Sequence, residues 1–194
     1  MLTRVLDVVL AALLLAVTAP LIALAALAIR LESRGAVFYR QLRVGRDGRA
    51  FELWKLRTMV PGAESMGAGL YVLEGDPRIT RTGRLLRRFS LDELPNLVNL
   101  LRGEMAIVGP RPTVQEQVDG YTDRQRRRLE VRPGITGWAQ INGRASLPWP
   151  DRIELDVWYV EHRSLRLDLR ILARTARMLA TWHGLYSEDL KQGW

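Results

Sequence analysis

The chain has 194 residues, the size of one ordinary domain, and 47% of them are hydrophobic, which is enough for a buried core. Its formal net charge of +8 favours an anionic partner, such as a nucleic acid, phospholipid head groups or a phosphorylated substrate. The absence of cysteine excludes a disulfide framework, a thiol nucleophile and a cysteine-ligated zinc site.

The N-terminal segment is the first predicted element. Residues 8–29 (VVLAALLLAVTAPLIALAALAI) contain no charged residue, and about 20 such residues suffice for a helix to cross a bilayer. A cleaved signal peptide is the alternative, but its apolar core spans only about 7–15 residues. Arginines follow the run at once, at positions 30, 34, 40, 43 and 46. Because such a flank keeps the following domain in the cytoplasm, we expect an uncleaved, membrane-inserted helix.

Pro20 lies near the middle of this run and has no N–H to donate to the carbonyl of Ala16. It either kinks a spanning helix or turns the helix back to the face it entered. The pattern alone slightly favours the spanning helix. In the re-entrant alternative, Arg4 and the later arginines all stay cytoplasmic. We therefore expect a membrane-inserted helix over residues 1–30 and a cytoplasmic domain over residues 31–194.

A small β-hairpin follows the apolar run. Residues 37–41 and 51–56 are rich in aromatic and branched side chains, and Asp47-Gly48 between them is typical of a tight turn. The next segment, residues 60–75, carries several glycines and is predicted to form a mobile loop.

An adjacent acid pair precedes a predicted helix. Pro95 suits the first residue of a helix, and Gly103 suits the position just after its end. Asp92 and Glu93 therefore lie immediately ahead of the helix N-terminus. They follow a stretch, residues 76–88, that contains five arginines. Two acids at the edge of so basic a stretch need a specific explanation.

The simplest explanation is a capping box from Ser90 to Glu93. Pro95 fits that box poorly, because it falls where the capped helix already needs its hydrogen bonds. Arginines also come from three separate turn-bounded segments: Arg57 in KLRTM, Arg78 in DPRITR and Arg111 in GPRP. We therefore expect cations to converge on a pocket around the acid pair.

The C-terminal half is predicted to be mostly helical. One helix is expected over residues 114–130, an ordered loop over 132–144 and a helical tail over roughly 150–182. In the tail, Arg170, Arg174 and Arg177 share one face, and Ile171, Met178 and Trp182 share another. This basic amphipathic pattern suits a membrane interface and, equally, a surface helix packed on the core. The predicted class is helix-rich α+β with C-terminal amphipathic helices.

An acid pair among cations suits phosphoryl transfer. Arginines and the N–H groups of a helix N-terminus hold phosphate oxygens. Mg²⁺ prefers one or two carboxylates together with phosphate oxygens. A second carboxylate can attack phosphorus and form an acyl phosphate, and nearby positive charge keeps that carboxylate ionised at neutral pH.

Three long segments resemble one known family. FYRQLRVGRDGRAFELWKLRTM (residues 38–59), DPRITRTGRLLRRFSLDELPNLVNLLRGEMAIVGPRP (76–112) and RPGITGWAQINGR (132–144) are similar to the bacterial monotopic phosphoglycosyl transferases. The resemblance implies a membrane-bound enzyme of exopolysaccharide or lipopolysaccharide synthesis. Such an enzyme moves a sugar-1-phosphate from a UDP-sugar to undecaprenyl phosphate, a polyprenol phosphate, and releases UMP. It works at the cytoplasmic face of the bacterial inner membrane, so residues 31–194 become the catalytic domain.

The resemblance also implies roles for single residues. Asp92 becomes the nucleophile that carries the phosphosugar covalently, and Asp92 and Glu93 together bind Mg²⁺. The implied phosphate ligands are Lys55, Arg57, Arg78 and Arg111, and Asp156 is a weaker candidate near the site. In such enzymes the N-terminal helix is re-entrant and bends at a Ser-Pro pair, whereas this chain has Ala19-Pro20.

Two other classes of function compete with this interpretation. A nucleic-acid binder would explain the charge, but the cations lie in scattered turns and the apolar N-terminus stays unexplained. A non-catalytic membrane scaffold would need no acid pair among cations. His162 and His183 have no metal-ligand spacing and are predicted to be structural or interfacial. The expected partners are a UDP-sugar, undecaprenyl phosphate and phospholipids, without nucleic acid. A homodimer and the identity of the sugar stay open.

Overall fold

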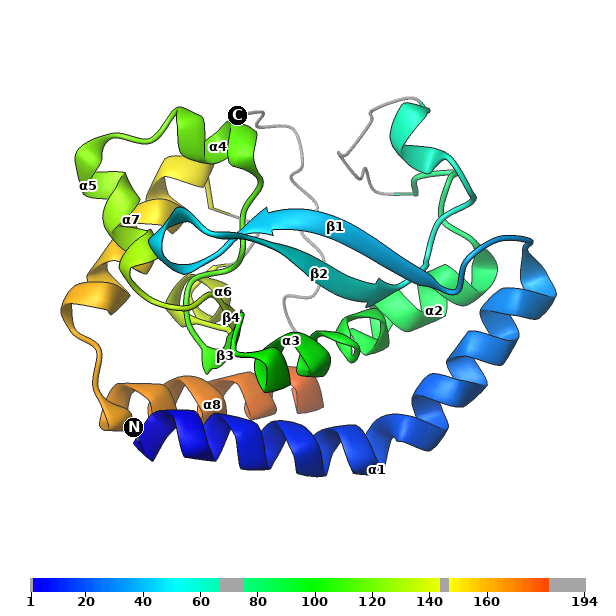
Figure 1. Ribbon diagram of the computed structural model, residues 1–194, viewed down its shortest axis with the longest axis horizontal. Coiled ribbons are helices and arrows are strands. Elements are labelled where there is room, and N and C mark those ends of the chain that lie inside the picture. Colours follow the sequence, from blue (N-terminus) through cyan, green and yellow to red (C-terminus); the bar gives the residue numbers. More distant parts are fainter. Residues whose placement is uncertain (1, 67–74, 144–146, 182–194) are drawn as a thin grey trace.

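The computed structural model describes residues 2–66, 75–143 and 147–181, so positions 67–74 of the predicted loop, Trp182 and His183 lie outside the described residues. The chain is a helix-rich α+β protein, as predicted (Figure 1). The helices are α1 (Leu2–Glu32), α2 (Arg81–Arg88), α3 (Asn96–Arg102), α4 (Gln115–Asp119), α5 (Asp123–Arg126), α6 (Trp138–Ile141), α7 (Trp149–Glu161) and α8 (Leu165–Thr181). The strands are β1 (Phe38–Val44), β2 (Ala50–Leu56), β3 (Ala106–Val108) and β4 (Gly134–Thr136).

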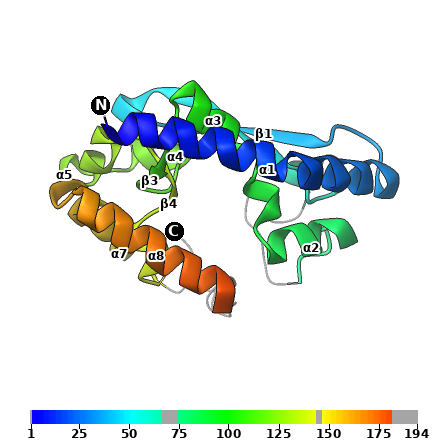
Figure 2. The same ribbon diagram turned by 90° about the horizontal axis from the view of Figure 1, so that it is seen from below.

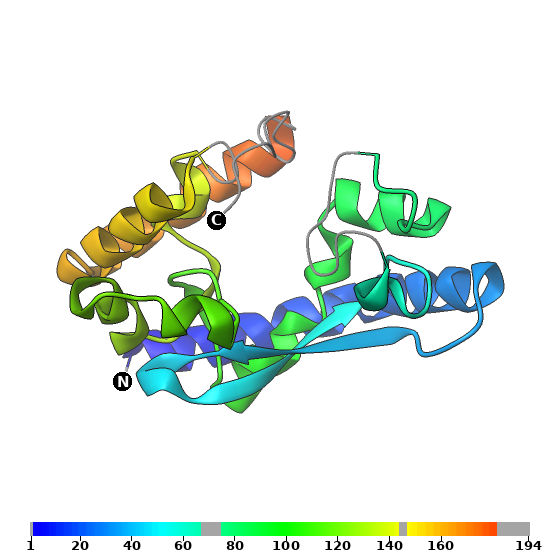
Figure 3. The same cartoon turned by 90° about the horizontal axis from the view of Figure 1, so that it is seen from above.

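Strands β1 and β2 form the predicted antiparallel hairpin. Asp47 (φ 56°) and Gly48 (φ 76°) adopt the left-handed conformations that its tight turn requires. The hairpin lies on α3, and α3 lies on α1, so three layers stack in the middle of the molecule (Figure 1). Helices α4 to α8 gather at one end of the hairpin and α2 at the other (Figure 3). The buried side chains between the layers include Ala11 of α1, Leu53 of β2 and Leu100 of α3.

The segment over residues 132–144, predicted as an ordered loop, contains strand β4 and helix α6. β4 pairs in parallel with β3, with Ala106 opposite Gly134. The two backbone segments approach each other so closely here that a Cβ atom on Gly134 would lie 2.1 Å from the Gly109 nitrogen. The partners of these short strands are far apart in the sequence, which is why local patterning indicated only a loop.

Helix α1 continues through Pro20 (Figure 1) and bends along its length. The proline leaves the carbonyl of residue 16 without its usual donor. Nearby, the Thr18 hydroxyl donates to the Leu14 carbonyl oxygen 2.7 Å away, a contact that often accompanies a bend. Most leucines and valines of α1 are exposed. Among the helices of the described residues, α1 is the one that is long and apolar enough to cross a membrane.

The N-terminal end of α1 is fastened to the body. The Arg4 guanidinium donates to the carbonyl oxygens of residues 100 and 101, at 2.6 and 3.1 Å, where α3 ends. A cation is favourable at that position because the last carbonyls of a helix carry partial negative charge. One turn later, the Asp7 carboxylate accepts a hydrogen bond from the Ile107 amide at 3.2 Å.

The C-terminal end of α1 is fastened to the same body. The Glu32 carboxylate accepts hydrogen bonds from the amides of Arg81 and Thr82, at 2.7 and 2.9 Å, and so caps the N-terminus of α2. The Arg57 guanidinium donates to the carbonyl oxygens of residues 33 and 34, at 2.9 and 2.8 Å. Charged side chains therefore hold both ends of this apolar helix against one globular unit.

The prediction of a single helix over residues 114–130 is wrong. This segment forms α4, α5 and a 3₁₀ turn over Arg127–Glu130. α4 ends at Gly120, and Thr122 begins α5 with a capping box, in which its hydroxyl and amide exchange hydrogen bonds with Gln125 at 3.3 and 3.0 Å. This local capping breaks the segment because it satisfies the backbone groups of a new helix start.

The tail predicted over residues 150–182 is also divided, into α7 and α8. The Ser164 hydroxyl accepts a hydrogen bond from the Leu167 amide at 3.3 Å and so begins α8. Leu167 and Ile171 are buried, which confirms the alternative of a helix packed on the core. The exposed positions of α8 include Leu165, Leu169, Arg170 and Arg174. Seen from below, α8 and α1 lie on the same face of the molecule (Figure 2).

Candidate active site

A 3₁₀ turn over Leu91–Glu93 presents the acid pair between α2 and α3. Ser90 opens this turn in the left-handed conformation (φ 54°), which is costly for a residue with a side chain. Its hydroxyl makes no capping hydrogen bond, so the alternative of a capping box is wrong. α3 follows directly after Pro95 and ends at Gly103 (φ 82°), as predicted. The acids therefore lie at the entrance to α3 with their side chains free for other contacts.

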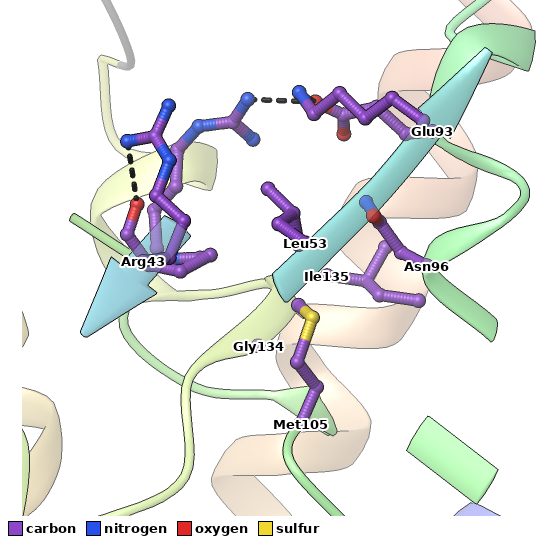
Figure 4. Close-up of a pocket in the computed structure, with 10 residues that line it drawn as sticks. Arg43, Leu53, Glu93, Asn96, Met105, Gly134 and Ile135 are labelled. Carbon is purple, nitrogen blue, oxygen red and sulfur yellow. Dashed lines mark hydrogen bonds and ion pairs between the residues drawn. The ribbon is translucent and has the colours of Figure 1, made fainter. Parts of the chain in front are cut away.

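Glu93 is held by two cations from distant segments. Its Oε1 atom accepts hydrogen bonds from Lys55 Nζ at 2.8 Å and from Arg111 Nη2 at 2.7 Å (Figure 4). Burial alone would raise the pKa of Glu93, but Arg111 and Lys55 together hold it well below the ordinary value of 4.5. Glu93 is therefore a stable anion at neutral pH, already surrounded by positive charge.

Asp92 has a different environment from its neighbour. Its side chain is buried, and no residue in the described ranges donates a hydrogen bond to its carboxylate. Burial raises the pKa of Asp92 above 3.8, the positive charge of Lys55 lowers it, and the Glu93 carboxylate raises it further. A carboxylate that is partly buried and is held by no donor is a stronger nucleophile than one that accepts several hydrogen bonds.

A small pocket opens beside Glu93 (Figure 4). Its cationic lining residues are Arg43, Lys55 and Arg111, and its apolar ones include Leu53, Met105, Pro112 and Ile135. Burial raises the pKa of Asp92, and two of the cations that line this pocket, Lys55 and Arg111, lie close enough to oppose that rise. The pocket therefore combines three cations with one anion, and the net positive charge suits a phosphate or diphosphate.

Sequence reasoning missed three residues of this site. Arg43 lies on the same face of the hairpin as Lys55, and burial together with Arg111 lowers the pKa of Arg43 to about 10. Arg87 lies close enough to Asp92 to lower its pKa, and its Nε donates to the Thr58 hydroxyl at 2.8 Å. Asn96 lines the pocket, and its buried Oδ1 atom has no hydrogen-bond partner among the described residues. The alternation of hairpin residues could have revealed Arg43, whereas no local pattern marks Asn96.

Three predicted site residues do not reach the pocket. The Arg57 guanidinium instead donates hydrogen bonds to the carbonyl oxygens that follow the end of α1. Arg78 is buried in an ion pair with Asp76, at 2.7 Å between Nη2 and Oδ2. Asp156 is buried in an ion pair with Arg128, at 2.6 Å. A neighbouring charge thus holds Arg78 and Asp156, backbone carbonyls hold Arg57, and none of the three lines the pocket beside Glu93. Their predicted roles stay predictions.

The acid pair fits a magnesium ion that arrives together with a phosphate. Within residues 2–66, 75–143 and 147–181 there is no cluster of three or more His, Cys, Asp or Glu side chains that could hold a metal. Mg²⁺ is often bound by only one or two carboxylates, with substrate phosphates and water completing its shell. Asp92 and Glu93 supply that number, and the Glu93 contacts described above engage only its Oε1 atom.

Comparison with known proteins shows which family of proteins this sequence matches. The family described as "Bacterial sugar transferase" matches residues 1–181. The "Uncharacterized sugar transferase EpsL" of Bacillus subtilis is 45% identical over 184 residues, which cover 95% of this chain and 90% of that protein. A "UDP-glucose:undecaprenyl-phosphate glucose-1-phosphate transferase" of Caulobacter vibrioides is 46% identical over 191 residues, 94% of this chain and 71% of that protein.

A third relative names a different sugar. It is a "UDP-N-acetylgalactosamine-undecaprenyl-phosphate N-acetylgalactosaminephosphotransferase" of Aeromonas hydrophila, 38% identical over 188 residues, which cover 93% of this chain and 44% of that protein. The names of the Caulobacter and Aeromonas proteins both contain undecaprenyl phosphate and differ in the sugar, whereas the name of EpsL specifies neither.

Proposed function

Because the chain belongs to the bacterial sugar transferase family and is a phosphoglycosyl transferase, we propose that it transfers a sugar-1-phosphate from a UDP-sugar to undecaprenyl phosphate and releases UMP. This is the first membrane step of exopolysaccharide or related surface-glycan synthesis. The names of the relatives support the two substrates. The observation that carries the chemistry is the Asp92 carboxylate, which accepts no hydrogen bond from the residues that the structure describes and lies near a cation-lined pocket.

The proposed reaction has two displacements at one phosphorus atom. In the first, an Asp92 oxygen attacks the β-phosphorus of the UDP-sugar, the bond from that phosphorus to the bridging oxygen breaks, and UMP leaves with the electron pair. In the second, a phosphate oxygen of undecaprenyl phosphate attacks the same phosphorus, and the Asp92 oxygen leaves as a free carboxylate. Each step exchanges one P–O bond for another, so neither step requires a proton acceptor.

The surrounding residues neutralise charge in both steps. In this proposal the pocket cations Arg43, Lys55 and Arg111 hold phosphate oxygens, and Arg87, whose charge reaches Asp92, supports the attacking carboxylate. Asp92 and Glu93 would hold Mg²⁺, which when bound supplies positive charge between the acids and the substrate phosphates. With a metal bound to Glu93, Lys55 and Arg111 would be able to hold substrate phosphates in place of Glu93.

Incubation with a radiolabelled UDP-sugar and Mg²⁺, without lipid acceptor, is expected to label the protein and release one UMP per active site. The reason is that the first displacement can proceed alone. The measurement is protein-bound label together with UMP, over a panel of UDP-glucose, UDP-galactose and UDP-N-acetylhexosamines. Release of UMP that strictly requires undecaprenyl phosphate, with no label on the protein, would replace the two-step route by direct transfer.

We propose that α1 is re-entrant, with both ends at the cytoplasmic face. The contacts of Arg4 and Asp7 at one end, and of Glu32 at the other, support this placement. A helix that crossed the bilayer would have to give up one of these sets, because its two ends would lie on opposite sides. The exposed apolar face of α1 and the outer face of α8 then contact phospholipids together.

The absence of cysteine allows a direct test of this topology. One variant carries a cysteine ahead of Met1, and another carries Leu31→Cys, at a position that is 78% exposed. In intact spheroplasts neither cysteine is expected to react with a membrane-impermeant maleimide, whereas both react after permeabilisation. Labelling of the N-terminal cysteine from outside would show that α1 spans the membrane.

A further inference from the structure

The loop that carries Arg111 is held by an unusually complete set of hydrogen bonds. Each carbonyl oxygen from residue 110 to residue 113 accepts one from a different place. The donors are Gly134 N to Pro110 at 2.8 Å, Arg128 Nη2 to Arg111 at 2.9 Å, Arg43 Nη1 to Pro112 at 3.4 Å and Val44 N to Thr113 at 2.8 Å. Two of these donors are backbone amides of paired segments. The carbonyl of Arg111 itself depends on a side chain, Arg128.

Arg128 is a rigid donor because its other contacts fix it in place. It is 2% exposed, and its Nε and Nη2 atoms donate to Asp156 Oδ2 at 3.1 and 2.6 Å. Its Nη1 atom donates to the Tyr121 hydroxyl at 2.6 Å. The guanidinium carbon lies 5.7 Å from the centre of the Tyr121 ring and 5.6 Å from that of Trp149. A planar guanidinium held at its edges and faces loses little further entropy when it also bonds the Arg111 carbonyl.

We propose that Arg128 and Asp156 are positioning residues for Arg111. The pair fixes the backbone from which the Arg111 side chain reaches Glu93, at 2.7 Å between Nη2 and Oε1. A line of contacts thus runs from α7 through Arg128 to the acid pair. The inference rests on the proposed function, because it assumes that Arg111 holds a phosphate of the donor.

A purely structural ion pair is the competing explanation, and the details argue against it. Taking two charges out of water is costly, and apolar side chains of similar size often replace a buried pair without loss of stability. The second oxygen of Asp156, Oδ1, is buried and has no partner in the part of the chain that the structure describes, which adds to that cost. What apolar side chains cannot supply is the hydrogen bond to the Arg111 carbonyl.

The test is the double variant Arg128→Met, Asp156→Leu, which removes both charges together and so avoids an unpaired buried charge. We expect its thermal midpoint to stay near the wild-type value, while kcat/KM for UMP release falls about 100-fold, the loss typical of a group misplaced by about 1 Å. The matched control is Arg124→Met, because Arg124 is 55% exposed on the adjacent helix and pairs with Glu154 at 2.9 Å. That control is expected to keep wild-type kcat/KM.

A mutant cycle that combines the double variant with Arg111→Met shows whether the loss of kcat/KM is transmitted through Arg111. If Arg128 acts through Arg111, adding the double variant to Arg111→Met lowers kcat/KM by no more than about 3-fold. A full additional loss of about 100-fold would overturn the inference, and so would wild-type kcat/KM in the double variant itself.

The affinity for UDP is measured by calorimetry, without turnover, in the same set of variants. Failure of wild type to release UMP would remove the proposed function but leave this binding cycle as a test of positioning. Equal, additive losses of UDP affinity would then count against the role of Arg128 and Asp156.

Discussion

Replacing Asp92 by asparagine is expected to abolish labelling of the protein by UDP-sugar and to lower UMP release by at least about 1,000-fold, the scale seen when a covalent nucleophile is removed. Asparagine has nearly the same shape, so the turn over Leu91–Glu93 is preserved. Its amide cannot form the acyl phosphate. The measurement is protein-bound label and initial rate of UMP release at saturating Mg²⁺.

The same substitution is expected to raise the thermal midpoint. Burial raises the pKa of Asp92 in the folded state above its ordinary value of 3.8, and Lys55 opposes this only in part. A raised pKa means that folding favours the neutral form, so wild-type stability falls as the pH rises from 3.8 through the folded pKa. At pH 7 the asparagine variant no longer bears the cost of burying an anion. Lower activity with higher stability is the signature of a functional acid, because a structural acid would lose stability on replacement.

Asp151→Asn provides the control, since Asp151 is an exposed acid at the start of α7. It is expected to keep wild-type labelling and rate. Label that persisted on the Asp92→Asn protein would show that another group attacks phosphorus, and the two-step route through Asp92 would have to be abandoned.

Elements whose beginning and end are set by residues close by in the sequence could be predicted. The apolar run, the Asp47-Gly48 turn, and the start and stop of α3 at Pro95 and Gly103 carry their own local signals. They are enough to place the acid pair ahead of a helix. The same kind of reasoning failed for residues 114–130, because a short capping box outweighs the periodicity of a longer helix.

The partners of single arginines could not be predicted in this way. Arg57 and Arg111 look alike in the sequence, each in a short basic segment after a strand. One meets the carbonyls at the end of α1 and the other meets Glu93, and only the tertiary arrangement decides between them. Arg128 belongs to a basic run that is typical of a solvated surface. It is buried because its partner, Asp156, comes 28 residues later on a helix packed against it.

Replacing Glu93 by glutamine is expected to lower kcat by about 100- to 1,000-fold, the range found when one preorganised electrostatic group is lost from a site. Glutamine keeps the length of the side chain but removes the charge that Lys55 and Arg111 share, at 2.8 and 2.7 Å. The Mg²⁺ concentration for half-maximal rate is expected to rise at least about 10-fold, because one of the two proposed carboxylate ligands becomes neutral. Rates over a series of Mg²⁺ concentrations measure both effects.

The Michaelis constant distinguishes this role of Glu93 from simple substrate binding. Lys55 and Arg111 lose their anionic partner in the variant, so they are free to bind substrate phosphates, and KM for the UDP-sugar is expected to stay the same or to fall. Stabilisation by Mg²⁺, measured as the shift of the thermal midpoint, is expected to disappear in the variant. Glu52→Gln is the control, because Glu52 forms an exposed pair with Arg40 at 3.3 Å on the same hairpin and should leave kcat and the Mg²⁺ dependence unchanged. A variant with normal kcat and only a lower thermal midpoint would make Glu93 a structural anchor for two cations, and the metal would then have to depend on Asp92 and the substrate alone.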